Sequence, residues 1–537
     1  MDNHIMSHLA FLVFSTYLFL PIDCATYPTN ICTQTPYPRL CNSLISTTQP
    51  QSTLDDINLP DFRDTSLRAT LAQAENALKL VSNMDLRSFN ELGKSAWTDC
   101  LELYEDTVYK LNRSIESNNA LIDAQTWLSA SIANEQTCQN GFLDFNLSSH
   151  LQSLPFMLSD FTKFLSNSLA INKAMSLSSS SSSASSLKTT KQTKNRRLLL
   201  SSHDNDFPEW ISSGDRKLLQ SSGATVKADI VVAQDGSGNY KTISEALAAA
   251  AKQRSGTNRF VIYVKKGVYK ENIDVKRSMR NLMFIGDGID STIVTGNKNV
   301  QDGSTTFRSA TFAVSGDGFI ARDMTFENTA GPNKHQAVAL RSGSDFSVFY
   351  TCSFKGYQDT LYLYAQRQFY RNCDIYGTID FIFGDAVAVI QNSNIYVRKP
   401  MPNQKNTVTA QSRKDPNQNT GIIIHASRVS TSAASGYENY LGRPWQRYSR
   451  TVFMKCEIDG GIAAAGWLPW SGDFGLSTLY YGEYMNTGSG ASTGGRVKWP
   501  GYHVIGSGAE AGKFSVGSFL GGDSWIPNTG VPFTSGL

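Results

Sequence analysis

A stretch near the middle of the chain repeats its own pattern, and this repeat constrains the fold more than any other feature. Laid over themselves at an offset of 21, residues 348–384 align Cys352 with Cys373 and Asp359 with Asp380. A self-match of this period is typical of a solenoid, in which equivalent positions stack on successive coils. Stacked strands lie about 4.8 Å apart, so we expect the two aspartates to be close neighbours. Like charges so near each other are unfavourable unless one is protonated or a cation lies between them, and catalytic acid–base chemistry uses this arrangement.

The surrounding region, residues 223–537, consists of short β-branched runs broken by Gly, Asn and Asp. A helical pattern is nearly confined to residues 243–251. Repeated short strands without intervening helices predict a right-handed parallel β-helix, an all-β fold. A β-sandwich is the alternative. The similar segments that begin at Asn372, Asn392 and Lys455 argue against it, because parallel coils repeat one strand direction and one face.

Residues 26–175 differ, since apolar residues recur at helical spacing and glycine is scarce, which predicts an all-α helical bundle in front of the β-helix. Residues 176–222 then begin with a serine run and continue with many basic residues. Such a segment cannot bury enough apolar surface to offset its ordering entropy, so we expect a disordered linker. An exposed linker is open to proteases, and two dibasic pairs are candidate processing sites: Arg196-Arg197 and Arg216-Lys217.

Residues 1–25 predict a secretory signal peptide, because an apolar run at residues 9–22 fits one, although the usual basic residues before it are missing. An uncleaved membrane anchor is the alternative. Sequons at Asn112 and Asn146 agree with secretion and glycosylation. In an oxidising compartment cysteines can pair. No pair of them has zinc-ligand spacing, and we expect neither a metal nor a cofactor.

The charge of the β-rich region points to a polyanionic partner. From residue 221 onward the chain has 32 lysines and arginines against 24 aspartates and glutamates. A basic enzyme domain attracts polyanions by electrostatic steering. We expect no nucleic acid, since the sequence has no arginine-rich arm, zinc finger or RNA-binding signature. A secreted chain would more readily meet an acidic polysaccharide.

Four polar clusters in the β-rich region are candidates for a catalytic site, at residues 335–340, 356–360, 380–384 and 441–445. On a β-helix such groups project from the outer face of one sheet, where a polymer can lie along a groove. Gln336 and Gln358 are 22 residues apart, and Asp359 and Asp380 are 21 apart. Both spacings are near one coil, so we expect the two amides and the two acids on adjacent coils.

These clusters, together with residues 235–240, resemble the plant pectin methylesterases. The helical region resembles the plant invertase and pectin methylesterase inhibitor domain. Its motifs are Cys32 and Cys41 with Tyr37-Pro38 between them, residues 97–100, and residues 123–130 leading to Cys138. The resemblance covers residues 26–537 and implies a full-length pro-enzyme. It also implies two disulfides, Cys32–Cys41 and Cys100–Cys138.

The resemblance implies catalytic roles for four residues, which stand at the family's motif positions in this sequence. Asp380 is implied as the nucleophile and Asp359 as the general acid and base. Gln336 and Gln358 are implied as donors that stabilise the oxyanion. The implied substrate-binding residues are Thr306, Gln336, Arg443 and Trp445.

The chemistry of the side chains supports these roles independently. A carboxylate that attacks an ester must be ionised, and a guanidinium such as that of Arg443 favours the ionised form. The second acid must first hold a proton, which an ionised neighbour helps it to keep; it can then protonate the leaving methoxide and later activate water. Amide donors suit a tetrahedral oxyanion. Sugar rings stack on flat faces, for which the candidates are Phe381, Trp445, Trp467 and Trp470.

Each assignment also has a purely structural interpretation. An aspartate in a turn usually caps the backbone, and Gln336 could belong to an inward polar ladder. Trp467 and Trp470 could pack a loop. The family commonly has a cysteine at the position of Ser393, paired with the equivalent of Cys373, so that bridge is impossible here. Cys352 and Cys373 either bridge each other or are buried thiols, as we expect for Cys456.

We therefore predict a secreted, extracellular pectin methylesterase that hydrolyses methyl esters of homogalacturonan to pectate and methanol in the plant cell wall, through an aspartate nucleophile. Its helical domain would be an inhibitor or a folding aid, removed by a protease at the linker. We expect a monomer, with separate inhibitor proteins as further partners. Two other functions stay open: a β-helix glycoside hydrolase or lyase with paired carboxylates, and a wall-binding protein whose acids are relics. The motif at residues 490–494 matches that of serine hydrolases, but we expect a loop there.

Overall fold

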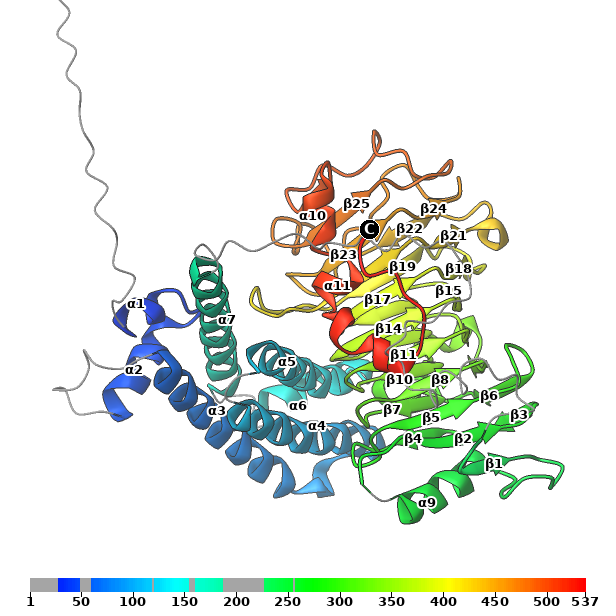
Figure 1. Ribbon diagram of the computed structural model, residues 1–537, viewed down its shortest axis with the longest axis horizontal. Coiled ribbons are helices and arrows are strands. Elements are labelled where there is room, and N and C mark those ends of the chain that lie inside the picture. Colours follow the sequence, from blue (N-terminus) through cyan, green and yellow to red (C-terminus); the bar gives the residue numbers. More distant parts are fainter. Residues whose placement is uncertain (1–27, 49–58, 118–119, 154–159, 187–226, 255) are drawn as a thin grey trace, which may run out of the picture.

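The computed structural model describes residues 28–48, 59–117, 120–153, 160–186, 227–254 and 256–537. A helical domain lies against one side of an elongated stack of β-coils (Figure 1). The predicted signal peptide and both dibasic pairs lie outside the described residues. Within them, no helix is both long enough and apolar enough to cross a lipid bilayer.

Three parallel sheets run the length of the stack, as the predicted β-helix requires. Sheet A contains, in spatial order, β1 (Ile230–Val232), β2 (Phe260–Val264), β5 (Leu282–Ile285), β8 (Ile320–Arg322), β11 (Ser347–Tyr350), β14 (Arg367–Arg371), β17 (Val387–Gln391), β20 (Gly421–His425), β23 (Arg450–Met454), β25 (Tyr480–Tyr484) and β26 (Tyr502–Val504). Sheet B contains β3 (Gly267–Lys270), β6 (Thr292–Gly296), β9 (Thr325–Asn328), β12 (Ser353–Lys355), β15 (Asp374–Gly377), β18 (Asn394–Val397), β21 (Arg428–Ser430) and β24 (Glu457–Ile458). Sheet C contains β4 (Ile273–Val275), β7 (Phe312–Val314), β10 (Leu340–Ser342), β13 (Leu361–Leu363), β16 (Ile382–Gly384), β19 (Asn406–Gln411) and β22 (Asn439–Gly442).

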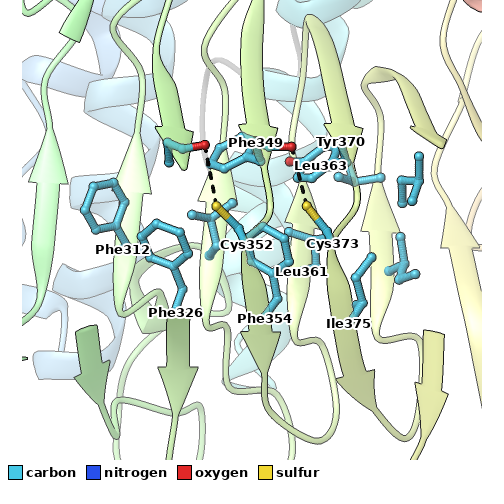
Figure 2. Close-up of a cluster of buried hydrophobic side chains, with 14 of the residues drawn as sticks. Phe312, Phe326, Phe349, Cys352, Phe354, Leu361, Leu363, Tyr370, Cys373 and Ile375 are labelled. Atoms are coloured by element: carbon cyan, nitrogen blue, oxygen red, sulfur yellow. Dashed lines mark hydrogen bonds between the residues drawn. The ribbon is translucent and has the colours of Figure 1, made fainter. Parts of the chain in front are cut away.

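The core is a column of inward side chains that stack from coil to coil, and the 21-residue repeat is visible in it (Figure 2). Phe349 pairs with Tyr370 in the register of sheet A, and their rings stack with centroids 4.8 Å apart. Phe354 pairs with Ile375 in sheet B. The predicted alignment of the sequence with itself is therefore a physical stacking of neighbouring coils.

The three cysteines of this domain are buried free thiols, so Cys352 and Cys373 do not bridge. Each thiol instead donates to backbone carbonyls, such as Cys373 Sγ to Phe349 O at 3.4 Å (Figure 2). Ser393 stacks next in the same column, where its Oγ accepts a hydrogen bond from the backbone N–H of Cys373 at 3.1 Å. The hydroxyl thus binds the neighbouring coil where a cysteine could have bridged it.

Tight corners join sheet A to sheet B, and one residue of each corner adopts the left-handed conformation. The φ angles are 53° at Asn372, 50° at Asn392 and 48° at Met485. Asparagine tolerates this region better than other side chains, because its short polar group bonds locally. The Asn-x-Asx pattern of the sequence marks the corners at Asn372 and Asn392.

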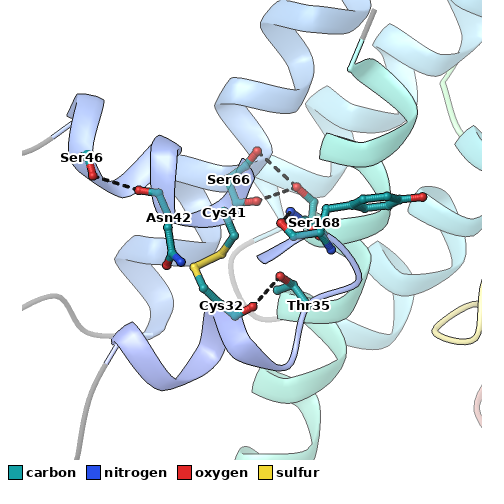
Figure 3. Close-up of a disulfide and its surroundings, with 9 residues drawn as sticks. Cys32, Thr35, Cys41, Asn42, Ser46, Ser66 and Ser168 are labelled. Atoms are coloured by element: carbon teal, nitrogen blue, oxygen red, sulfur yellow. Dashed lines mark hydrogen bonds between the residues drawn. A yellow bond between two sulfur atoms is a disulfide. The ribbon is translucent and has the colours of Figure 1, made fainter. Parts of the chain in front are cut away.

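The helical domain contains α1 (Pro28–Thr33), α2 (Pro38–Thr48), α3 (Leu59–Ser82), η2 (Leu86–Ser88), α4 (Glu91–Glu116), α5 (Leu121–Asp144), α6 (Ser148–Ser153) and α7 (Phe161–Ser186). Both implied disulfides are present: Cys32–Cys41 joins α1 to α2 (Figure 3), and Cys100–Cys138 joins α4 to α5. Beside the first bridge, the hydroxyls of Ser66 and Ser168 share a buried hydrogen bond of 2.7 Å that links α3 to α7.

The helix α7 continues to Ser186, so the serine run at residues 176–186 is helical in the structure. The sequence predicts a disordered linker here, because a serine-rich and basic segment cannot bury enough apolar surface to offset its ordering entropy. Extending an existing helix gains one backbone hydrogen bond for each residue that is fixed, whereas only nucleation is costly. A packed helix can therefore continue into a serine run that would not start one.

Short elements close the remaining surfaces of the stack. Helix α9 (Ile243–Gln253) agrees with the predicted helical segment and packs Ile243 and Leu247 onto the core. The C-terminal elements α10 (Gly508–Gly512), α11 (Val516–Phe519), η9 (Gly522–Ser524) and η10 (Ile526–Thr529) cover the outer face of sheet A. Three short turns of helix lie between strands: η6 (Phe307–Ser309), η7 (Pro332–Lys334) and η8 (Ser432–Ala434). The segment at residues 490–494 is a loop, as expected.

The helical domain covers the outer face of sheet C. One buried apolar cluster combines residues of α4 and α5, such as Ala96 and Phe142, with outward residues of sheet C, such as Tyr362 and Phe383. Ion pairs surround this cluster, including Arg113 to Asp317 at 2.8 Å and Lys414 to Glu135 at 3.0 Å. The candidate catalytic side chains lie beside this contact.

Candidate active site

The two aspartates lie in successive turns that lead from sheet B into sheet C. Asp359 stands two residues before β13, and Asp380 stands two residues before β16. Both have positive φ angles, 62° and 51°, and both are nearly buried. A left-handed residue turns the chain sharply, and aspartate is among the few side chains that tolerate it. The turn geometry therefore places both carboxyl groups at one edge of the outer face of sheet C.

Asp380 is surrounded by donors that suit an ionised carboxylate. Arg443 binds it in a bidentate manner, with Nε to Oδ1 at 2.8 Å and Nη2 to Oδ2 at 2.6 Å. The hydroxyl of Thr407 donates to Oδ1 at 2.6 Å. Charge-assisted bonds of this kind are strong and fix the carboxylate in one orientation. Both carboxylate oxygens of Asp380 thus accept hydrogen bonds from neighbouring side chains at the wall of the cleft.

Asp359 has the opposite electrostatic environment. Burial raises the pKa of its carboxyl well above the usual range, the negative charges of Asp380 and Asp144 raise it further, and Arg443 acts in the other direction. Asp359 is therefore the protonated member of the pair. Two neighbouring acids with unequal environments can divide the roles of nucleophile and proton donor.

The predicted residues meet at one cleft of about 500 Å³. Its wall includes every residue to which the resemblance assigns a catalytic or substrate-binding role, namely Thr306, Gln336, Gln358, Asp359, Asp380, Arg443 and Trp445. Gln336 lines this cleft and is partly exposed, which argues against an inward polar ladder. The individual roles of these residues remain predictions.

Aromatic residues form the floor of the cleft, and the sequence analysis missed three of them. Tyr362 and Phe383 stack with centroids 4.2 Å apart, and Phe307 lies beside them. Tyr362 and Phe383 are themselves 21 residues apart, so the repeat that located the aspartates could also have located this pair. Trp445 contacts Phe383 at 5.9 Å between centroids.

Two of the aromatic residues that we predicted to bind sugar are in the core instead. Phe381 is fully buried among inward side chains, because it lies in the turn between the left-handed Asp380 and β16, where the alternation of strand faces does not hold. Trp467 is also buried and stacks on Tyr481 at 4.2 Å. Trp470, in contrast, is partly exposed, borders the cleft and lies 4.5 Å from the guanidinium carbon of Arg443.

The helical domain forms the roof of this cleft. The C-terminal end of α5 and the residues after it supply Asn140, Leu143, Asp144 and Asn146 to its lining. The carboxylate of Asp144 accepts a hydrogen bond from the backbone N–H of Thr306 at 2.8 Å. A carboxyl group of the helical domain therefore lies in the cleft that holds the candidate catalytic residues.

Comparisons with known proteins agree with this architecture. The Pectinesterase family profile matches residues 229–523, and the Plant invertase/pectin methylesterase inhibitor profile matches residues 26–171. The chain belongs to the pectinesterase family, whose members are carboxylic ester hydrolases.

Three similar proteins illustrate the relationship. "Probable pectinesterase/pectinesterase inhibitor 6" of Arabidopsis thaliana is 57% identical, over 94% of this chain and 93% of its own. "Pectinesterase 2" of Citrus sinensis is 51% identical, over 94% of each chain. The solved structure of pectin methylesterase from carrot is 57% identical with a TM-score of 0.57, and it aligns 99% of its length with 58% of this chain. The carrot chain is thus a folded β-helix without a helical domain.

Proposed function

We propose that the protein removes methyl groups from esterified homogalacturonan in the plant cell wall, using Asp380 as a nucleophile. The observation that carries this proposal is the unequal surroundings of the two acids: Arg443 binds Asp380 through bidentate hydrogen bonds, whereas burial raises the pKa of Asp359 well above its usual range. The aromatic floor suits sugar rings, and the cleft lies on the outer face of a long sheet, where a polymer fits.

The reaction proceeds in two steps. The carboxylate of Asp380 attacks the ester carbonyl, and the amide groups of Gln336 and Gln358 donate hydrogen bonds to the oxyanion. Asp359 gives its proton to the leaving methoxide, which departs as methanol. Asp359, now a carboxylate, takes a proton from water, and the resulting hydroxide cleaves the acyl–enzyme anhydride. This step restores Asp380 and leaves a free carboxylate on the sugar.

The helical domain acts as an inhibitor within the same chain, and cleavage in the linker begins activation. Its residues Leu143 and Asp144 line the cleft that the polymer would enter. Secretion, glycosylation at Asn112 and Asn146, and a monomeric state belong to the same proposal. Separate inhibitor proteins could bind the same face of sheet C once it is uncovered.

Inhibition by the helical domain is tested by comparing the full-length chain with residues 227–537. The carrot protein indicates that the β-helix folds alone. We expect at least about tenfold higher kcat/KM for methanol release from residues 227–537, because a covered cleft cannot admit a polymer. Equal rates for the two chains would contradict inhibition.

The role of Asp380 is tested with Asp380→Asn in residues 227–537. Asparagine keeps the shape and tolerates the positive φ angle, so the variant should fold, but it cannot attack the ester. We expect methanol release from esterified pectin to fall about 10³-fold or more. Asp374→Asn on sheet B, on another face of the coil, is the matched control and should retain activity. Full activity of Asp380→Asn would remove it as the nucleophile, and shortened polymer chains would indicate a glycosidase or lyase.

A further inference from the structure

The outer face of sheet C carries a basic residue, Arg341, that the proposed mechanism does not use. Arg341 pairs in register with Tyr362 of the next strand, and Tyr362 pairs in turn with Phe383. These three side chains form one outward row. Arg341 therefore lies about 10 Å, or two strand spacings, from Phe383 along the axis of the stack. A polymer that lies over the aromatic floor would continue across Arg341.

Arg341 lines a second cleft of about 780 Å³ between α4 and the β-helix. Its guanidinium carbon lies 3.5 Å above the ring of Phe307. Phe307 borders both clefts, so the catalytic cleft and the second cleft adjoin at this ring. Arg308, on the same short helical turn as Phe307, also lines the second cleft.

Arg341 has unused hydrogen-bonding capacity. It is only 4% exposed, yet its Nε lacks a hydrogen-bond partner among the described residues. Burying a polar group without a partner costs free energy. A guanidinium that is stacked on a ring is already oriented, so it loses little freedom when it binds a planar carboxylate.

The helical domain places a carboxylate at this position. Asp99 of α4 is fully buried, accepts a hydrogen bond from Thr305 Oγ1 and forms an ion pair with Arg308. The positive charge of Arg341 also acts on the carboxyl group of Asp99. The β-helix therefore already holds one carboxylate here, bound by Thr305, which itself lines the catalytic cleft.

We propose that Thr305, Arg308 and Arg341 form a subsite for a free carboxylate of the galacturonan chain, which Asp99 occupies in the full-length protein. This inference rests on the proposed function. It predicts that the enzyme binds best where an ester at Asp380 has an already de-esterified unit nearby. A methyl ester at the subsite would bring no charge to the two guanidinium groups and would leave them without a counterion.

The test uses the variant Arg341→Gln in residues 227–537. Without the helical domain, α4 no longer covers this position, so we expect the variant to fold. A fully de-esterified oligogalacturonate serves as a competitive inhibitor of methanol release. Since hydrogen bonds to charged groups contribute about 1.5–3 kcal/mol, we expect its inhibition constant to rise about tenfold or more. The ratio of kcat/KM for partly de-esterified pectin to that for fully esterified pectin should fall by a similar factor.

Arg428→Gln is the matched control. Arg428 is an exposed residue of sheet B, so this substitution removes the same charge far from the cleft. It should leave the inhibition constant and the substrate ratio unchanged. Arg341→Lys should restore part of the binding, since it keeps the charge but not the planar fork. An unchanged inhibition constant in Arg341→Gln, or an equal change in Arg428→Gln, would overturn the subsite. If the unmodified domain releases no methanol from either pectin, the proposed function itself fails.

Discussion

At the scale of single residues, the two aspartates occupy equivalent positions on neighbouring coils and still differ in chemistry. Asp380 has Arg443 and Thr407 as donors, whereas Asp359 is buried next to negative charge. The difference arises from residues far away in the sequence that belong to other coils. The repeat thus sets the spacing of the two aspartates, and the neighbours that do not repeat make their chemical environments different.

Gln336 offers a test of oxyanion stabilisation. Gln336→Ala in residues 227–537 removes one donor, which is typically worth about 3–4 kcal/mol in the transition state. We expect kcat for methanol release to fall about 10²- to 10³-fold while KM changes much less, because the donor acts on charge that develops during the reaction. Gln253→Ala at the exposed end of α9 is the control. A change in KM alone would mean that Gln336 only binds substrate.

The sequence predicted the polar residues of the site better than its aromatic ones. Paired acids and amides at coil spacing are rare and chemically specific, so they could be recognised. Phe381 and Phe383 are equally aromatic and only two residues apart, yet Phe381 lies in the turn after Asp380 and enters the core, whereas Phe383 lies in β16 and faces the cleft. Where the turn ends and the strand begins depends on the whole coil and was not available from the local sequence.

At the scale of elements, the corners between sheets A and B show how the chain tolerates local strain. Asn372 and Asn392 fill two of these corners with the preferred residue, whereas Met485 fills another with an exposed apolar side chain at a φ of 48°. A left-handed conformation costs most side chains about 1 kcal/mol or more. This corner is therefore a place where the fold can be stabilised.

We predict that Met485→Asn raises the stability of the β-helix by about 0.5–1 kcal/mol, since asparagine adopts the left-handed region more readily. The midpoint of thermal unfolding of residues 227–537 measures this change. Met485→Leu, which has no such preference, should leave the midpoint unchanged. A lower midpoint for Met485→Asn would show that the methionine contributes packing that its exposure does not reveal.

At the scale of the whole molecule, the contact between the domains could not be derived from the sequence. The helical pattern predicted a bundle, and the charge predicted a polyanionic partner. The row of carboxylates on α4 and α5 that meets the basic side of the β-helix depends on how two separate domains pack, as in the pairs Asp99 with Arg308 and Glu135 with Lys414. Sequence patterns within one domain contain no information on that packing.

This contact should depend on pH. Burial raises the pKa of Asp99 to about 6, against the lowering effects of Arg308, Thr305 and Arg341, while Glu102 raises it further. In the separated helical domain the pKa would return to about 3.9. The carboxyl group of Asp99 therefore binds its proton more tightly in the docked state. Protonation of Asp99 favours docking fully below about pH 4, and this contribution is lost as the pH rises through 6. Burial likewise raises the pKa of Asp144, which acts in the same sense.

Gel filtration of the protein after cleavage in the linker measures this effect. We expect the two fragments to stay associated at pH 4.5 and to bind about 20-fold more weakly at pH 7, since a pKa of about 3.9 in the free domain and about 6 in the docked one is only partly expressed over this interval. Asp99→Asn should reduce the pH dependence. Tighter association at pH 7 than at pH 4.5 would contradict the sign of this linkage.

The helical domain and the groove that it covers are parts of one polypeptide, joined through residues 187–226. While the chain is intact, the roof of the cleft is present at a fixed local concentration, and diluting the protein cannot remove it. A single cut in this segment breaks no contact between the domains, but it turns their association into a bimolecular equilibrium. The fraction of enzyme that has lost its helical domain would then rise as the cleaved protein diffuses and is diluted. Activity would therefore increase with distance from the site of processing.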